Sequence, residues 1–104
     1  MSDRLGGPLF IEVDGSGALL VRGDIDIASG PTLDSHLARA EAGTPITLDL
    51  SDVDFIDSSG LRTLLTATRR ASQRGTVLRL RNVGATVRRM LEITGTEGQF
   101  EIEE

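Results

Sequence analysis

Short runs of β-type residues recur along the chain and predict five strands. The predicted strands cover residues 9–13, 18–22, 46–50, 76–81 and 99–102. Between the first two, Asp14-Gly15-Ser16-Gly17 has the composition of a turn, so we expect an antiparallel hairpin. The third run is more continuously apolar than alternating, which indicates a buried strand. Glutamates flank the last run, which favours an edge strand because charge there discourages aggregation between sheets.

Apolar residues at helical spacing predict a helix after the second strand. The segment Gly23-Asp24-Ile25-Asp26 is expected to end that strand and turn the chain. Pro31 suits the first turn of the helix, with Ser29 or Gly30 as the cap and Gly43 as the stop. The narrow apolar stripe of this helix consists of Leu33, Leu37 and Ala40.

Two further helices are predicted in the second half of the chain. The longer one covers residues 58–74 and is stopped by Gly75. Its pattern residues are Leu61, Leu64, Leu65, Thr68 and Ala71. The last helix is stopped near Gly95, and its apolar residues are Val87, Met90 and Leu91.

The predicted element order is β-β-α-β-α-β-α-β, which indicates an α/β fold with a mixed sheet. Strands that alternate with helices imply right-handed crossovers, so we expect the helices mainly on one face of the sheet. The 104 residues suit one domain, 1–104, with 1–8 as a frayed N-terminal arm. The aromatic residues are all phenylalanine, so the core is expected to be aliphatic.

The chain is organised around the junction between the third strand and the long helix. A short acidic connection there leads into Asp57-Ser58-Ser59-Gly60-Leu61. Asp57 and Ser58 are both good N-cap residues, and capping is the favoured role for Ser58. Gly60 has no side chain, so another molecule could approach the backbone and the Ser59 hydroxyl closely. Phe55 and Ile56, just before the motif, are expected to be core anchors.

Composition excludes several classes of function. There is no cysteine, which excludes disulfides and thiolate metal sites, and no lysine, which excludes a P-loop lysine or a Schiff base. No apolar run approaches about 18 residues, so no membrane insertion is expected. Residues 1–8 do not resemble a signal peptide, so we expect a cytoplasmic protein.

Charge is distributed unevenly along the chain. Residues 1–61 hold 11 acidic and 3 arginine residues, 62–89 hold 8 arginines and no acid, and 90–104 hold 5 glutamates. Such asymmetry can steer a partner, although a solvated surface accounts for most of these arginines. The net charge of −5 and the lack of an aromatic platform argue against nucleic-acid binding.

Ser59 has three possible roles. As a phosphoacceptor it would sit at a helix start, where free N–H groups and the helix dipole favour negative charge. As a nucleophile it would need a base, but the only histidine, His36, is predicted on the half-exposed flank of another helix, and no G-x-S-x-G motif occurs. As a helix cap it would have only a structural role, and this interpretation remains an alternative to phosphorylation. Asp52, Asp54 and Asp57 suggest Mg²⁺, but no phosphate-cradling glycine loop accompanies them, so neither a metal nor a cofactor is predicted.

These motifs resemble the STAS domain, in the small single-domain form of the anti-sigma factor antagonists. The resemblance rests on Asp57-Ser58-Ser59-Gly60-Leu61 after a strand and on Gly23-Asp24-Ile25-Asp26 upstream, and it extends from about residue 9 to about residue 102. It implies a bacterial partner-switching protein that binds an anti-sigma factor and so releases a sigma factor for transcription. The anti-sigma factor is implied to be an ATP-dependent serine kinase, and a metal-dependent serine phosphatase resets the switch. The protein itself would be substrate and ligand, not an enzyme.

The resemblance also implies which residues carry the switch. Phosphorylation is expected on Ser59, with Ser58 as the alternative if the register differs by one. The expected partner-binding residues are Asp24, Asp57, Ser58, Ser59, Gly60, Leu61 and Arg62. Without the resemblance, Asp24 would be read as an ordinary turn residue. Asp26 is a weaker candidate for partner binding and could instead cap the next helix.

Two positions depart from the family pattern. Arg62 stands where many relatives carry a small residue, and it could pair with a phosphate on Ser59 or simply be solvated. Thr96 stands where leucine is frequent, which puts the packing of the C-terminal segment in question.

Other interpretations of the chain remain. One is a STAS subunit of a membrane-transport complex that docks on an ATPase without phosphorylation. Another is a nucleotide-binding STAS module, for which the sequence offers no glycine-rich fingerprint. The free protein is expected to be a monomer or weak dimer.

Overall fold

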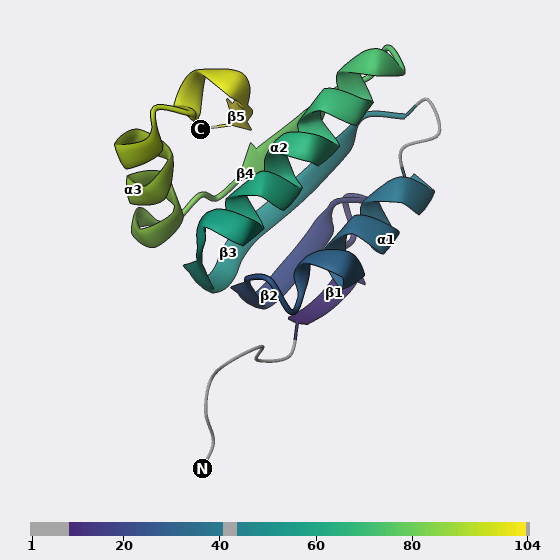
Figure 1. The fold of residues 1–104 in the computed structure, drawn as a ribbon. Coiled ribbons are helices and arrows are strands. Elements are labelled where there is room, and N and C mark those ends of the chain that lie inside the picture. The colour runs from purple at the N-terminus through teal and green to yellow at the C-terminus, as the bar shows by residue number, and fades with distance from the viewer. Residues whose placement is uncertain (1–8, 41–43, 104) are drawn as a thin grey trace.

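A five-stranded sheet forms the framework of the molecule, and the strands follow one another across it in sequence order, β1-β2-β3-β4-β5 (Figure 1). The computed structural model describes residues 9–40 and 44–103. Its strands are β1 Leu9–Val13, β2 Leu19–Ile25, β3 Ile46–Ile56, β4 Leu78–Arg81 and β5 Glu101–Glu103. Its helices are α1 Gly30–Ala40, α2 Ser58–Gln73 and α3 Ala85–Thr94, followed by a short 3-10 turn, η1 Glu97–Gln99. The predicted element order is confirmed.

The direction of the strands places the helices on one side of the sheet. β1 pairs with β2 in antiparallel fashion, as predicted for a hairpin, and β2 through β5 are parallel neighbours. Every parallel connection steps the same way across the sheet, so right-handed crossovers put the intervening helices on the same face. Figure 1 shows α1 lying over β1 and β2, with α2 beside it over β3 and β4.

The core is one continuous, mainly aliphatic layer between this sheet face and the helices. Leu33 of α1, Leu64 of α2 and Leu91 of α3 are completely buried in the same cluster as buried strand residues such as Leu48 and Leu80. Burial of each such side chain contributes roughly 1.5–3 kcal/mol. The predicted stripe at Leu33 and Leu37 is confirmed, and the core is aliphatic as expected except for Phe100, which belongs to the buried cluster. The predicted stop Gly43 lies outside the described residues.

The opposite sheet face carries charged strand residues, together with the exposed Phe10, which is the register partner of Arg22. In β4, Leu78 and Leu80 point into the core, while Arg79 and Arg81 point to the other side, as the two-residue period of a strand requires. Arg22 on β2 lies 3.6 Å from the carboxylate of Asp52 on the neighbouring strand β3. Because these groups are exposed, such pairs contribute little each. No helix in the described ranges is long and apolar enough to span a membrane.

Two strands run further than the sequence pattern predicts. β2 continues through Ile25 and β3 through Ile56, and these two end residues are register partners. The segment predicted as an acidic connection is therefore mostly strand. A register irregularity between Gly23 and Asp24 of β2 interrupts the simple alternation opposite β3. Ile56 is a core anchor as predicted, but Phe55 is 46% exposed, so its assignment to the core was wrong.

The C-terminal segment packs despite its polar substitution. Gly75 and Gly95 adopt left-handed φ angles of 75° and 69° where α2 and α3 end, which confirms both predicted helix stops. Thr96 is buried, but its hydroxyl lies 2.9 Å from that of Thr94 and so keeps a hydrogen-bond partner. β5 is an edge strand as expected, next to β4.

A cluster of charged side chains joins the β1–β2 turn to the polar face of the sheet. Arg81 donates to Asp14 at 2.7 Å and to Asp49 at 3.0 Å, and Asn82 donates to the same Asp49 oxygen at 2.9 Å. Burial disfavours the charged form of Asp49, but hydrogen bonds from Ser51, Arg81 and Asn82 outweigh it and lower its pKa. Hydrogen bonds from Ser16, and then from Arg81, lower the pKa of Asp14 strongly.

This cluster predicts a specific acid sensitivity. Because both carboxyl pKa values lie below the ordinary value of 3.8, the ionised groups favour the folded state. Their contribution is complete above pH 3.8 and is lost as the pH falls through the lower folded values. We expect urea unfolding of a D14N/D49N variant to depend less on pH below 4 than unfolding of the wild type. Asp54→Asn, an exposed carboxylate outside the cluster, is the control and should keep the wild-type dependence; equal slopes for all three proteins would contradict this account.

Candidate functional site

The carboxyl end of β3 and the start of α2 form a capped junction. Asp57 has an extended backbone, and its Oδ1 accepts a hydrogen bond from the Gly60 N–H at 2.8 Å. The Asp57 N–H in turn donates to the carbonyl oxygen of Ile25 at the end of β2, at 3.2 Å. Asp57 is therefore the N-cap, as predicted. Ser58 is the first residue of the helix and is exposed, so the cap role favoured for it was wrong.

Ser59 is the second residue of α2, and its hydroxyl plays no part in the cap. The side chain is half-buried, and its Oγ has no hydrogen-bond partner in residues 9–40 and 44–103. Only its backbone carbonyl is engaged by a side chain, since it accepts from Thr63 Oγ1 at 3.3 Å. The hydroxyl lines a surface hollow and is thus available to chemistry that does not disturb the helix cap.

Gly60 and Leu61 lie under the site rather than on it. A Cβ on Gly60 would collide with the carbonyl group and side chain of Ile25, so glycine is required for α2 to start this close to β2. Leu61 is 5% exposed and belongs to the core cluster. The expectation that Gly60 leaves space for another molecule was wrong, because Ile25 of this protein occupies that space. Neither residue presents a side chain to a partner.

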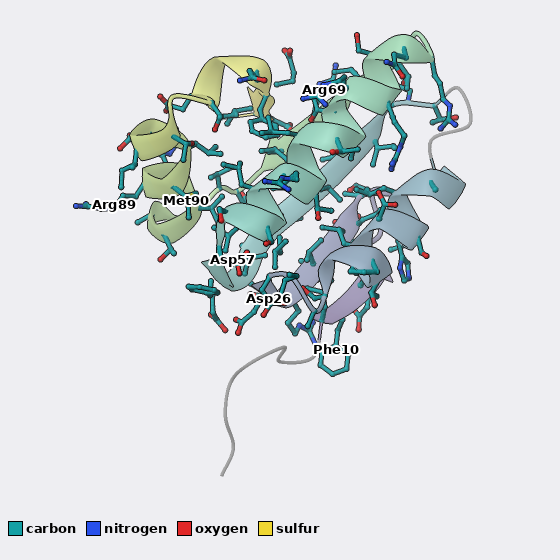
Figure 2. All side chains as sticks on the ribbon, in the orientation of Figure 1. Phe10, Asp26, Asp57, Arg69, Arg89 and Met90 are labelled. Atoms are coloured by element: carbon teal, nitrogen blue, oxygen red, sulfur yellow. The ribbon has the colours of Figure 1, made fainter. Side chains whose placement is uncertain are left out.

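The acidic residues at the end of β2 are also turned inward. Asp26 Oδ1 accepts hydrogen bonds from the N–H groups of Ala28 and Ser29 at 3.0 Å. Asp26 therefore stabilises the turn that leads into α1, in line with the prediction that it could help to cap this helix. Ser29 Oγ donates to the Asp24 carbonyl at 2.7 Å. Asp24 is only 5% exposed, so its side chain has little surface to offer a partner. Asp26 and Asp57 lie at the same end of α1 and α2 (Figure 2), since the Asp57 N–H bonds to Ile25, the residue before Asp26.

A shallow hollow of about 480 Å³ lies between α1 and α2, and Ser59 is one of its lining residues. Asp34 and Arg70 face each other across it and form an ion pair of 2.7 Å. Arg62, one turn after Ser59, also lines the hollow and is exposed. Ile27 borders it with 76% of its surface exposed. Sequence reasoning missed Ile27 because an isolated apolar residue in a turn gives no sign of where it will lie.

The only histidine does not lie beside Ser59. The His36 Nδ1 lies 3.0 Å from the carbonyl oxygen of Thr32 on its own helix, and the ring does not line the hollow. The half-exposed flank predicted for His36 is confirmed. No group of three potential metal-ligating side chains occurs in the part of the chain that the structure describes. What the arrangement provides is an accessible hydroxyl on a capped helix beside a charged hollow.

Comparison with known proteins agrees with this architecture. The family model of the STAS domain matches residues 8–104. The anti-sigma-B factor antagonist of Bacillus subtilis (strain 168) is 31% identical over 83 residues, which are 79% of this chain and 76% of that protein. The chain therefore belongs to the STAS domain family, among the relatives of the single-domain anti-sigma factor antagonists.

Solved structures show the same fold. The crystal structure of an anti-sigma factor antagonist from Mycobacterium paratuberculosis superposes with a TM-score of 0.72 and 26% identity, covering 91% of this chain and 83% of that one. The Bacillus cell fate determinant SpoIIAA in its phosphorylated form gives a TM-score of 0.66 at 20% identity, covering 93% of this chain and 92% of that one. The mixed sheet with its helices is thus shared across distant sequences.

The close approach of α2 to β2 makes Gly60 a sensitive position. Alanine usually stabilises a helix by about 1 kcal/mol relative to glycine. We nevertheless expect Gly60→Ala to destabilise the protein by roughly 1–3 kcal/mol, because the new methyl group meets rigid backbone at Ile25. Chemical denaturation measures this change. Ser72→Ala, on the exposed side of the same helix, is the control and should be neutral or slightly stabilising; a stabilised Gly60→Ala protein would contradict the packing argument.

Proposed function

We propose that this protein is an anti-sigma factor antagonist whose binding to an anti-sigma factor is controlled by phosphorylation of Ser59. The observation that carries the proposal is that Asp57 caps α2 while the Ser59 hydroxyl stays unbonded in the described structure and lines the surface hollow. A hydroxyl needed for capping could not be modified without loss of stability, whereas this one is free. Family membership supports the partner class, since named relatives are anti-sigma-B factor antagonists.

The modification would be an ordinary phosphoryl transfer performed by the partner. The anti-sigma factor, acting as a serine kinase, holds Mg·ATP and places its γ-phosphorus at Ser59 Oγ. The Oγ–P bond forms as the bond from phosphorus to the bridging oxygen breaks, ADP leaves, and the hydroxyl proton passes to a base of the kinase. A metal-dependent phosphatase hydrolyses the ester to restore the hydroxyl. The protein described here supplies the substrate side chain and performs no catalysis.

Electrostatics explains how one phosphate can release the partner without unfolding the protein. The group adds about −1.5 to −2 charges at neutral pH. At the second residue of α2 it meets the positive end of the helix dipole, so the fold tolerates it. A partner docked over the same place meets new negative charge and lost contact, which can cost several kcal/mol. We assign the direct contact to the accessible residues Asp57, Ser58, Ser59 and Arg62, and a supporting role to the buried Asp24, Gly60 and Leu61.

Phosphorylation of Ser59 can be tested by mass spectrometry. After incubation with its cognate anti-sigma kinase and ATP, the protein should carry one phosphate, located on Ser59. Ser59→Ala should abolish the modification, and Ser58→Ala, one exposed position earlier, should retain it. Modification of Ser58 alone would shift the site by one residue, and absence of phosphate from both would refute the switch.

A phosphomimetic variant separates docking from folding. We expect Ser59→Asp to weaken binding to the anti-sigma kinase by roughly tenfold or more, equivalent to about 1.4 kcal/mol. Its melting temperature should stay close to that of the wild type, because a carboxylate near a helix N-terminus is favourable. Isothermal titration calorimetry and thermal denaturation measure the two effects. A large fall in melting temperature would instead favour a purely structural role for Ser59.

A further inference from the structure

Arg62 stands apart from the other cation of the hollow. Arg70 lines the same hollow but is bound to Asp34 at 2.7 Å. Arg62 is exposed, and its guanidinium has neither a hydrogen-bond nor an ion-pair partner within residues 9–40 and 44–103. In the unmodified protein it is therefore the uncommitted arginine of the described hollow.

Helix geometry directs Arg62 toward Ser59. The two residues are three apart on α2, so their Cβ atoms lie about 5–6 Å from each other on one helix face. Helical side chains lean toward the N-terminus, which carries the long Arg62 side chain back over the first turn, where Ser59 lies. Both side chains line the same hollow. A guanidinium placed in this way can reach a phosphate on Oγ without any change in the backbone.

The remaining charges near Ser59 favour a cationic partner for the phosphate. Asp57 and Asp26 both lie at this end of the paired helices, and their Oδ1 atoms already accept backbone N–H bonds. They add like charge beside a phosphate and have no donor to offer it. An arginine provides a planar set of donors that matches phosphate oxygens and forms strong charge-assisted hydrogen bonds.

We infer that Arg62 is the intramolecular partner of a phosphate on Ser59, solvated in the unmodified protein and paired with the phosphate in the modified one. The inference deepens the proposed function and depends on Ser59 being the phosphorylated residue. Phosphorylation then has two effects on the docking face, which consists of the accessible residues Asp57, Ser58, Ser59 and Arg62. It adds an anion, and it withdraws the exposed Arg62 cation from contact with a partner.

The pairing can be measured on protein that carries phosphoserine at position 59 by genetic encoding, so that no kinase is needed. A ³¹P NMR titration gives the second pKa of the phosphate. A nearby cation stabilises the dianion, so we expect this pKa to be about 0.2–0.4 unit lower in the wild-type chain than in Arg62→Gln, given the usual strength of pairs one helical turn apart. The ¹⁵Nε resonance of Arg62 should also shift on phosphorylation.

Arg69 provides a matched control, because it is exposed on the same helix and lies two turns further from its start (Figure 2). Arg69→Gln removes the same charge and should leave the phosphate pKa within about 0.1 unit of wild type, since exposed charges at that distance are screened. An unchanged pKa in Arg62→Gln would overturn the inference, as would equal changes in both variants, because these results would mean no specific pairing.

The result is independent of the test of the proposed function. If the cognate kinase fails to modify Ser59 while the encoded phosphoserine shows the pKa difference, the proposed switch fails and the pairing stands. If the kinase modifies Ser59 but Arg62→Gln titrates like the wild type, the switch stands and the role of Arg62 is refuted.

Discussion

The hydrogen bond from the Gly60 N–H to the Asp57 carboxylate is the interaction on which the site depends. It starts α2 at a fixed residue, and the bond from the Asp57 N–H to the Ile25 carbonyl ties that start to the end of β2. Gly60 allows the helix to lie against Ile25 at a distance that no other residue could accept. With the cap and the packing supplied by these residues, Ser59 is held in a rigid place while its hydroxyl remains unused.

Different residues of the motif therefore serve folding and partner binding. The buried residues of the motif, Gly60 and Leu61, position the first turn of α2, and the accessible ones face outward at the end of the sheet. A phosphate can then be added and removed with little consequence for folding, because it meets the favourable end of the helix dipole. The same group changes the charge of the docking face, and that change controls association.

Local chemistry made much of the fold predictable from the sequence. Hydrophobic periodicity predicted the element order, and Gly75 and Gly95 marked helix ends because a left-handed residue there favours glycine. Asp57 was recognised as a cap for the same local reason. The exposure of Phe55 was not predicted, because β3 has one extra residue, Asp54, opposite the step from Gly23 to Asp24 in β2, and this irregularity breaks the two-residue alternation of β3.

The site itself was only partly predictable, since burial depends on contacts between distant segments. The motif identified Ser59, but the reason for Gly60 is its contact with Ile25 on strand β2. The burial of Asp24 likewise appears only in the folded structure. Asp34 pairs with Arg70 and not with Arg62, and this contact joins two different helices. Contacts of this kind join segments that are distant in the sequence, so they are visible only in the folded structure.

The most direct test of the account compares the unfolding free energies of Asp57→Ala and Ser59→Ala by chemical denaturation. If Asp57 alone caps α2, its replacement should cost about 1 kcal/mol, with a range of roughly 0.5–2 kcal/mol for N-cap loss. Ser59→Ala should stay within about 0.5 kcal/mol of the wild type, as expected for a substitution that breaks no bond. A cost at Ser59 equal to that at Asp57 would contradict the account, because it would mean that the fold already uses the hydroxyl.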